Sequence, residues 1–231
     1  MARFLAPRAD ARKIAAADSV AVLGLGRFGT SLALELMAAG THVLGVDQHE
    51  ANVQVLNGEL TQVVKADITR PEVIEQLSIS EFDRVVVAIG NDLQASILTC
   101  SLMLSLGIPN IWAKAQDDRH GLILKQLGVH HIVYPEKDMG RRVAHLVRGA
   151  IMDYLEVDKG YAMVKMTVPA FLHGVPLGET RIRASHGVTI AAHASAAGAW
   201  QNADAATVLS PGDRVLVLGP SARAEAFGQL H

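Results

Sequence analysis

Cysteine, aromatic residues and excess charge are all scarce in this sequence, and each scarcity excludes a class of protein. The 231 residues include one cysteine, Cys100, so a single chain holds neither a disulfide framework nor a cysteine zinc site. The formal net charge is −2, so no basic field points to nucleic acid. Aromatic residues make up only 4%, so Ala, Val, Leu and Ile must fill the core, as is usual where helices cover a parallel sheet.

Long apolar runs are also missing. The longest lies within Ile97–Ile108 and is broken by Thr99, Ser101 and Ser105. Because a membrane span needs about 20 apolar residues, we expect no segment that crosses a bilayer. Residues 1–18 carry several basic side chains but no long apolar core, so they do not resemble a secretory signal and are predicted to form an N-terminal arm. These features predict a cytoplasmic protein.

The sequence does contain a regular alternation of two hydrophobic periods. Over the first two thirds of the chain, short β-branched runs alternate with helix-like segments that end at glycines. The predicted strands are Val20–Leu25, His42–Val46, Gln62–Lys65, Arg84–Ala88, Ile111–Ala115 and Ile132–Tyr134. Strands that alternate with helices predict a parallel, doubly wound α/β sheet of the Rossmann type, here over residues 19–137.

The pattern changes after residue 137. The periodicity of Asp138–Leu155 predicts one long helix, so residues 138–156 are predicted to link two domains. The remaining residues, 157–231, contain short strands separated by turn residues and predict a small α+β domain. These strands are Ala162–Val168, Val188–His193 and Arg214–Leu218.

A glycine-rich turn joins the first predicted strand to the first predicted helix. Gly24, Gly26 and Gly29 have the G-x-G-x-x-G spacing, which is weak alone but here has the strand–turn–helix context that nucleotide binding requires. The first glycine permits a tight turn, the second lets the backbone approach a phosphate, and the third lets the helix pack closely. The helix N-terminus then offers free N–H groups to an anion. The flanking strands disfavour the alternative, a glycine turn that binds nothing.

Two charged residues limit which nucleotides the site can be expected to bind. Asp47 ends the second strand, where a carboxylate can accept both ribose hydroxyls. Its charge disfavours a 2′-phosphate, which leaves NAD(H), ATP and ADP. Arg27 opens the helix after the glycine turn and favours ATP or ADP, whose terminal phosphates an arginine binds well. The alternative for Arg27 is a solvated side chain near a helix start.

Two further acids follow later strands. Asp67 comes after the third strand and is either an acceptor for the adenine amino group or an ordinary loop carboxylate. Glu136 comes after the sixth strand, which places it at the carboxyl edge of the sheet as a helix start or as a ligand contact.

Catalytic motifs are not found. An NAD-dependent dehydrogenase needs a second domain that supplies a proton donor and a substrate clamp. The histidines and arginines of residues 157–231 lie in no such motif, and the sequence has neither G-x-S-x-G nor H-E-x-x-H. We therefore predict a protein that is not an enzyme, with an NAD-dependent oxidoreductase as the weaker alternative.

Several stretches of the chain resemble the RCK-domain regulatory subunits of bacterial Ktr and Trk potassium-uptake systems, especially the Ktr type. The matching stretches are Val22–Gly29, Val43–Asp47, Val85–Gly90, Gln94–Ser96, Ile108–Gln116 and Pro135–Gly140. They follow one another without an evident gap from about Val20 to Gly140. The C-terminal part resembles the RCK C-domain more loosely, chiefly at Pro211–Gly219.

The resemblance implies a function. Such subunits assemble as rings, commonly of eight chains, on the cytoplasmic face of a membrane potassium transporter. They bind ATP or ADP between pairs of N-domains, and the nucleotide changes the shape of the ring and the activity of the transporter. Trk-type relatives favour NAD(H), which is the alternative ligand here. The resemblance also implies that the linking helix crosses into a neighbouring chain.

The resemblance and the spacing together give a set of predicted ligand contacts. The predicted nucleotide-binding residues are Gly24, Gly26, Arg27, Phe28, Gly29, Asp47, Gln48, Asp67, Ile68, Ala88, Gly90, Lys114 and Glu136. The resemblance implies that Glu136 also binds a divalent cation, such as Mg or Ca, near the γ-phosphate. Some relatives bind a cyclic dinucleotide between C-domains; residues Arg181–Gly187 match only part of that pattern, so this ligand stays open.

Overall fold

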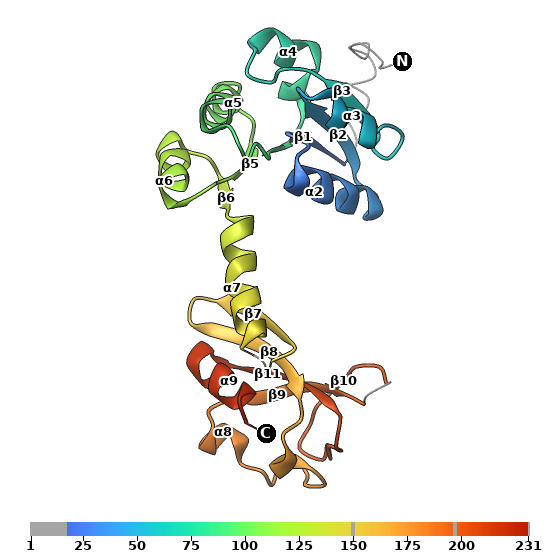
Figure 1. Ribbon diagram of the computed structural model, residues 1–231, viewed down its shortest axis with the longest axis vertical. Helices are drawn as coiled ribbons and strands as arrows, with labels where there is room; N and C mark the ends of the chain where they lie inside the picture. The colour runs from blue at the N-terminus through green and yellow to red at the C-terminus, as the bar shows by residue number, and fades with distance from the viewer. Residues whose placement is uncertain (1–17, 149–150, 196–197, 231) are drawn as a thin grey trace. The chain divides into compact units, whose positions relative to one another are not determined.

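The structure is a computed structural model that describes residues 18–148, 151–195 and 198–230 (Figure 1). The chain divides into two compact units, Met1–Lys137 and Asp138–His231. Nearly all of the predicted N-terminal arm, residues 1–18, lies outside the described residues. None of the described helices is both long enough and apolar enough to cross a membrane.

The first unit is built on six parallel strands. They are β1 Ser19–Leu23, β2 His42–Asp47, β3 Gln62–Lys65, β4 Arg84–Val87, β5 Asn110–Lys114 and β6 His131–Val133. Their order in the sheet is β3-β2-β1-β4-β5-β6, and every neighbouring pair is parallel. This confirms the predicted Rossmann-like sheet, with small shifts at the strand ends.

Helices cover both faces of this sheet because the strands are apolar on both sides. The helices are α2 Arg27–Ala38, α3 Glu50–Val55, α4 Pro71–Gln76, α5 Leu93–Ser105 and α6 Asp118–Leu127, with a 3-10 turn at Ile79–Glu81. Val20 and Val22 of β1 pack in one core with side chains of α2, while Ala21 and Leu23 pack in a second core with α4, α5 and α6. Successive strand residues point to opposite faces, so one strand serves both cores.

The order of the strands also creates a crevice. The chain leaves β1 toward the α2 face of the sheet and leaves β4 toward the α5 face. Adjacent strands whose connections diverge in this way leave a gap at their carboxyl ends, where ligands of doubly wound sheets bind. The fold therefore places the candidate site between the ends of β1 and β4.

The second unit is a five-stranded antiparallel sheet with short helices, which confirms the predicted small α+β domain. Its elements are β7 Asp153–Asp158, β8 Tyr161–Thr167, β9 Thr189–Ala194, β10 Gln201–Asn202, β11 Arg214–Pro220, α8 Ile182–Ser185, α9 Ser221–Gly228 and a 3-10 turn at Ala170–Leu172. The strand order is β10-β9-β11-β8-β7. Val164 and Met166 of β8 alternate with exposed or half-buried residues and pack with Phe227 of α9.

The predicted helix Asp138–Leu155 is wrong in its C-terminal part. Helix α7 spans Pro135–Val147, and the chain then forms strand β7 from Asp153. Tyr154 pairs with Val164 of β8, and its side chain is buried in the core of the second unit. Pairing and burial outweigh local helical periodicity, which cannot separate a short strand from a helix end.

Candidate functional site

A pocket of about 520 Å³ opens at the carboxyl edge of the parallel sheet, and all of its lining residues belong to the first unit. This volume is typical of small-molecule sites, which occupy roughly 300–1,000 Å³. Every predicted contact except Gly29 lines it. These lining residues are Gly24, Gly26, Arg27, Phe28, Asp47, Gln48, Asp67, Ile68, Ala88, Gly90, Lys114 and Glu136. The topology thus brings together residues that follow five different strands.

The three glycines of the turn have different surroundings. Gly24 has a φ of +101°, and a Cβ there would lie 3.1 Å from the backbone carbon of Ala88. A Cβ on Gly29 would clash with the carbonyl oxygen of Gly24, so Gly29 packs the helix on the turn and does not face the pocket. A Cβ on Gly26 would meet no atom within 4 Å, so Gly26 leaves open space beside the backbone.

The N-terminus of α2 is open toward the pocket. Its N-cap is Gly26, and among the described residues no side chain caps this end. By contrast, Asp92 accepts from Ala95 N at the start of α5. The first N–H groups of a helix have no partner inside the helix, and they carry positive potential. The start of α2, with Arg27 in its first turn, is therefore suited to hold a phosphate.

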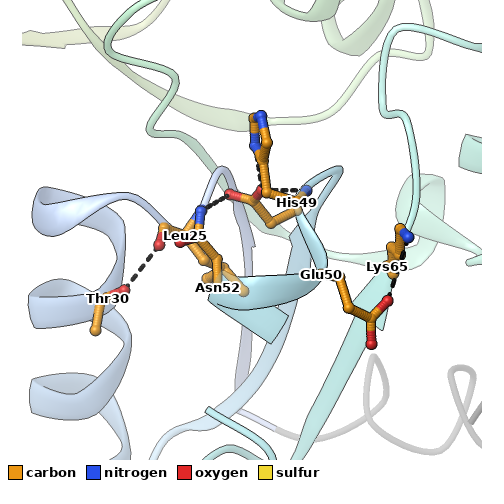
Figure 2. A network of polar contacts seen from close by, with 7 residues as sticks. Leu25, Thr30, His49, Glu50, Asn52 and Lys65 are labelled. Carbon is orange, nitrogen blue, oxygen red and sulfur yellow. Dashed lines mark hydrogen bonds and ion pairs between the residues drawn. The ribbon is translucent and has the colours of Figure 1, made fainter. Parts of the chain in front are cut away.

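Asp47 is buried, with 7% of its surface exposed, and its carboxylate accepts several hydrogen bonds. Oδ2 accepts from Leu25 N at 2.7 Å and from Asn52 Nδ2 at 3.1 Å. Oδ1 accepts from His49 N at 2.7 Å, and the ring Nδ1 of His49 lies 3.1 Å away. Figure 2 shows Leu25, His49 and Asn52 close to one another, and all three donate to this carboxylate.

These contacts set the charge of Asp47. Burial acts to raise the pKa of the carboxyl, but the hydrogen bonds from His49, Leu25 and Asn52 outweigh burial, and the pKa lies below its ordinary value. Asp47 is therefore ionised at neutral pH. An ionised carboxylate at the end of β2 can accept hydroxyl groups and repels a 2′-phosphate.

Positively charged side chains lie at the end of the pocket away from Asp47. Lys114 Nζ lies 2.5 Å from Glu136 Oε1; the lysine side chain is 10% exposed and the glutamate 59%. The same ammonium lies 6.0 Å from the centroid of the Phe28 ring. The hydrogen bond from Lys114 lowers the pKa of the Glu136 carboxyl, and the charge of Arg27 adds to this effect. Two cations and one carboxylate therefore share this end.

Asp67 differs from Asp47 in its exposure. It is exposed, and its Oδ1 accepts from Thr69 N at 3.0 Å and from Thr69 Oγ1 at 2.7 Å. Such a turn, in which an aspartate binds the backbone two residues on, fits the interpretation of an ordinary loop carboxylate. Asp67 also lines the pocket, so its contact with adenine stays a prediction.

Several residues that line the pocket were not predicted from the sequence. They are His49, Asn52, Ala66, Thr69, Ile89, Asn91, Asp92 and Ala95. All of them follow the carboxyl ends of β2, β3 and β4, where a doubly wound sheet places its ligand. That rule, applied to every polar residue after a strand, would have identified most of them.

Comparison with known families assigns both units. Residues 20–135 match the TrkA-N domain, and residues 161–231 match the TrkA-C domain. The chain belongs to the RCK-domain family. This confirms the family predicted from the sequence.

Two relatives of this RCK chain are described as potassium-uptake proteins. Ktr system potassium uptake protein C of Bacillus subtilis is 39% identical over 173 residues, 74% of this chain and 78% of the relative. Ktr system potassium uptake protein A of Vibrio alginolyticus is 33% identical over 201 residues, 87% of this chain and 91% of the relative.

Solved structures share the fold of the RCK chain at low sequence identity. The RCK domain of GsuK matches with a TM-score of 0.64 and 18% identity over 93% of this chain. This chain covers 47% of that GsuK chain, so it spans about half its length. GsuK has also been solved bound to NAD, with a TM-score of 0.51 and 22% identity over 92% of this chain and 38% of that one.

In the described ranges of the RCK chain, no three His, Cys, Asp or Glu side chains come together in a way that could hold a metal ion. Glu136 is a single carboxylate, and its nearest cation is Lys114. A divalent cation at Glu136 therefore needs additional oxygen ligands, and it stays a prediction.

Proposed function

We propose that this chain is a nucleotide-sensing regulatory subunit that binds ATP or ADP and controls a membrane potassium transporter of the Ktr type. The observation that carries the proposal is the pocket, which joins the ionised acid Asp47 to an open helix N-terminus flanked by Arg27 and Lys114. The relatives named as Ktr system potassium uptake proteins support the role in transport.

The electrostatics of the pocket favour adenosine phosphates. Asp47 suits an unmodified ribose, and the start of α2 suits the phosphate that follows it. Arg27 and Lys114 add two positive charges, which a terminal phosphate uses better than the bridging pyrophosphate of a dinucleotide. GsuK, which shares this fold, is solved with NAD, so NAD(H) is the second candidate.

A divalent cation such as Mg or Ca fits this site only in the presence of ligand phosphates. Glu136 offers one exposed carboxylate, and hard cations take six or more oxygen ligands. Phosphate oxygens and water would supply the rest. In this proposal Glu136 and the γ-phosphate share the cation, and ADP, which lacks that phosphate, holds it less well.

Catalysis is not part of the proposal. Cys100 is buried, and burial raises the pKa of its thiol to about 12, so it is no nucleophile at neutral pH. The oxidoreductase alternative requires turnover. Incubation of the purified chain with NADH and a panel of carbonyl substrates tests it by loss of absorbance at the nicotinamide band, and we expect none above the blank.

The proposed assembly is a homo-oligomer, with dimers forming an octameric ring on the cytoplasmic face of the membrane. Helix α7 supports this, because none of its residues is buried within the chain. Met139, Val143 and Val147 repeat at intervals of four residues and are 53%, 43% and 79% exposed. One apolar helix face left in water favours contact with a second copy.

Gating requires that the nucleotide bind two shapes of the ring with different affinity, because equal affinity would shift no equilibrium. Solution scattering of the chain with ATP plus Mg and then with ADP tests this step. We expect a large oligomer in both states with different profiles. A monomer throughout, or identical profiles, would contradict gating and leave nucleotide binding intact.

Calorimetry separates the ligand candidates. We expect ATP and ADP to bind the purified chain more tightly than NADH. Tighter binding of NADH would favour the Trk-type alternative, and no binding of any of the three would refute the proposed function.

A further inference from the structure

The carboxylate of Asp47 has no acceptor position left among the described residues. A carboxylate offers about four acceptor positions on its two oxygens. Leu25 N and Asn52 Nδ2 donate to Oδ2, and His49 N donates to Oδ1. The ring Nδ1 of His49 lies 3.1 Å from Oδ1, and it donates there in the tautomer that carries its hydrogen, because an ionised carboxylate can only accept. A ribose therefore cannot add two hydrogen bonds to this acid unless two existing donors leave.

The donors around Asp47 are of two kinds. Leu25 N and His49 N belong to the backbone, lie 2.7 Å from the carboxylate and cannot leave without moving the loops. The amide of Asn52 and the ring of His49 are side-chain groups, and both lie 3.1 Å away. Both residues line the pocket, and the side chain of His49 is 68% exposed. Each oxygen thus has one donor fixed by the backbone and one side-chain donor that can rotate away.

We propose that the ring of His49 and the amide of Asn52 stand in for the two ribose hydroxyls of a nucleotide, which replace them one for one when it binds. This inference rests on the proposed nucleotide binding. The two side-chain donors match the ribose in number, because a ribose carries two vicinal hydroxyls. They also match it in polarity, because both hydroxyls can donate hydrogen bonds. They match it in place as well, with one exchangeable donor on each oxygen.

The exchange has a consequence for affinity. Before a nucleotide binds, the stand-ins keep the buried carboxylate hydrogen-bonded, since an unsatisfied buried acceptor is costly. Each ribose hydroxyl then gains a hydrogen bond to Asp47 only by breaking another. His49 and Asn52 therefore lower nucleotide affinity, although both face the ligand. A residue that bound the nucleotide directly would raise it.

Calorimetry with ADP tests whether His49 and Asn52 lower nucleotide affinity. We expect Asn52→Ala and His49→Ala each to bind ADP roughly three- to tenfold more tightly than the wild type, the value of one modest hydrogen bond. Gln54→Ala is the matched control. Gln54 lies on the same helix as Asn52, and its amide donates to Glu50 at 3.2 Å and not to Asp47. This variant should bind ADP as the wild type does.

A second nucleotide distinguishes two causes of tighter ADP binding, the exchange of donors and a change in the shape of the pocket. 2′,3′-Dideoxy-ADP has no hydroxyl to replace the stand-ins, so we expect the gain of both variants to disappear with this analogue. An equal gain with ADP and with the dideoxy analogue would overturn the exchange.

The outcomes also separate this inference from the proposed function. Weaker or unchanged ADP binding in both variants, with normal binding by the wild type, overturns the stand-in role and leaves nucleotide sensing in place. Failure of the wild type and of every variant to bind ADP overturns both.

Discussion

The two ends of the pocket are built in different ways. At the proposed ribose end, Asp47 is buried and fixed by two backbone N–H groups. At the proposed phosphate end, Arg27 and Glu136 are exposed, and the start of α2 carries no side-chain cap within the described residues. A buried hydrogen-bonded charge is costly to change, whereas exposed charges on long side chains move at little cost. The first end is therefore suited to fix the class of ligand, and the second to distinguish its members.

Asp47→Asn should have the largest effect, because it removes the buried charge at the proposed ribose end. One amide N–H of asparagine must face a backbone N–H donor, so we expect the free energy of unfolding to fall by about 1–3 kcal/mol. Because Leu25 N adjoins the glycine turn, we also expect ADP binding to fall below detection by calorimetry. Asp67→Asn is the control, since Asp67 is exposed, and its unfolding free energy should change by less than about 0.5 kcal/mol. Equal effects of the two substitutions would remove the distinction between these acids.

Arg27→Ala should alter the phosphate end without harming the fold. We expect ATP affinity to fall roughly ten- to a hundredfold, the value of a lost charge-assisted hydrogen bond, with little change for AMP. Arg119→Ala is a matched control, because Arg119 is an exposed arginine in the first turn of α6 and lies outside the pocket. Equal losses for ATP and AMP would show that Arg27 does not bind the terminal phosphates.

Glu136→Gln should remove the proposed cation ligand at the same end of the pocket. The unfolding free energy should fall by about 1 kcal/mol or less, because the pair with Lys114 is partly exposed. We expect Mg to strengthen ATP binding to the wild type several-fold and to have no effect on the variant. If Mg still strengthens ATP binding to Glu136→Gln, the cation is held elsewhere.

The smallest expected effect is the change in stability that low pH causes through Asp47. The pKa of Asp47 is lowered in the folded chain, so its stabilisation is complete above the unfolded pKa of about 3.9 and is lost as the pH falls through the folded value. The stability difference between the wild type and Asp47→Asn, measured by denaturant unfolding, should therefore shrink below about pH 4. A difference that stays constant down to pH 2 would mean that Asp47 is not held by its charge.

Local sequence patterns were enough to predict the parallel sheet and most of the residues that line the pocket. Six β-branched runs in alternation with helices fixed the sheet, because hydrophobic period is a local property of the chain. The spacing of the glycine turn and the acids at strand ends placed Arg27, Asp47 and Glu136 at one edge, since the carboxyl ends of parallel strands meet there.

The contacts between these groups depend on the packing of the folded chain. The periodicity of Asp138–Leu155 predicted helix throughout, but pairing of β7 with β8 and burial of Tyr154 made its end a strand. The ion pair of Lys114 with Glu136 joins residues on different elements. Asn52 reaches Asp47 from the first turn of α3, which begins directly after β2. Such contacts depend on how elements pack, and local periodicity carries no information about packing.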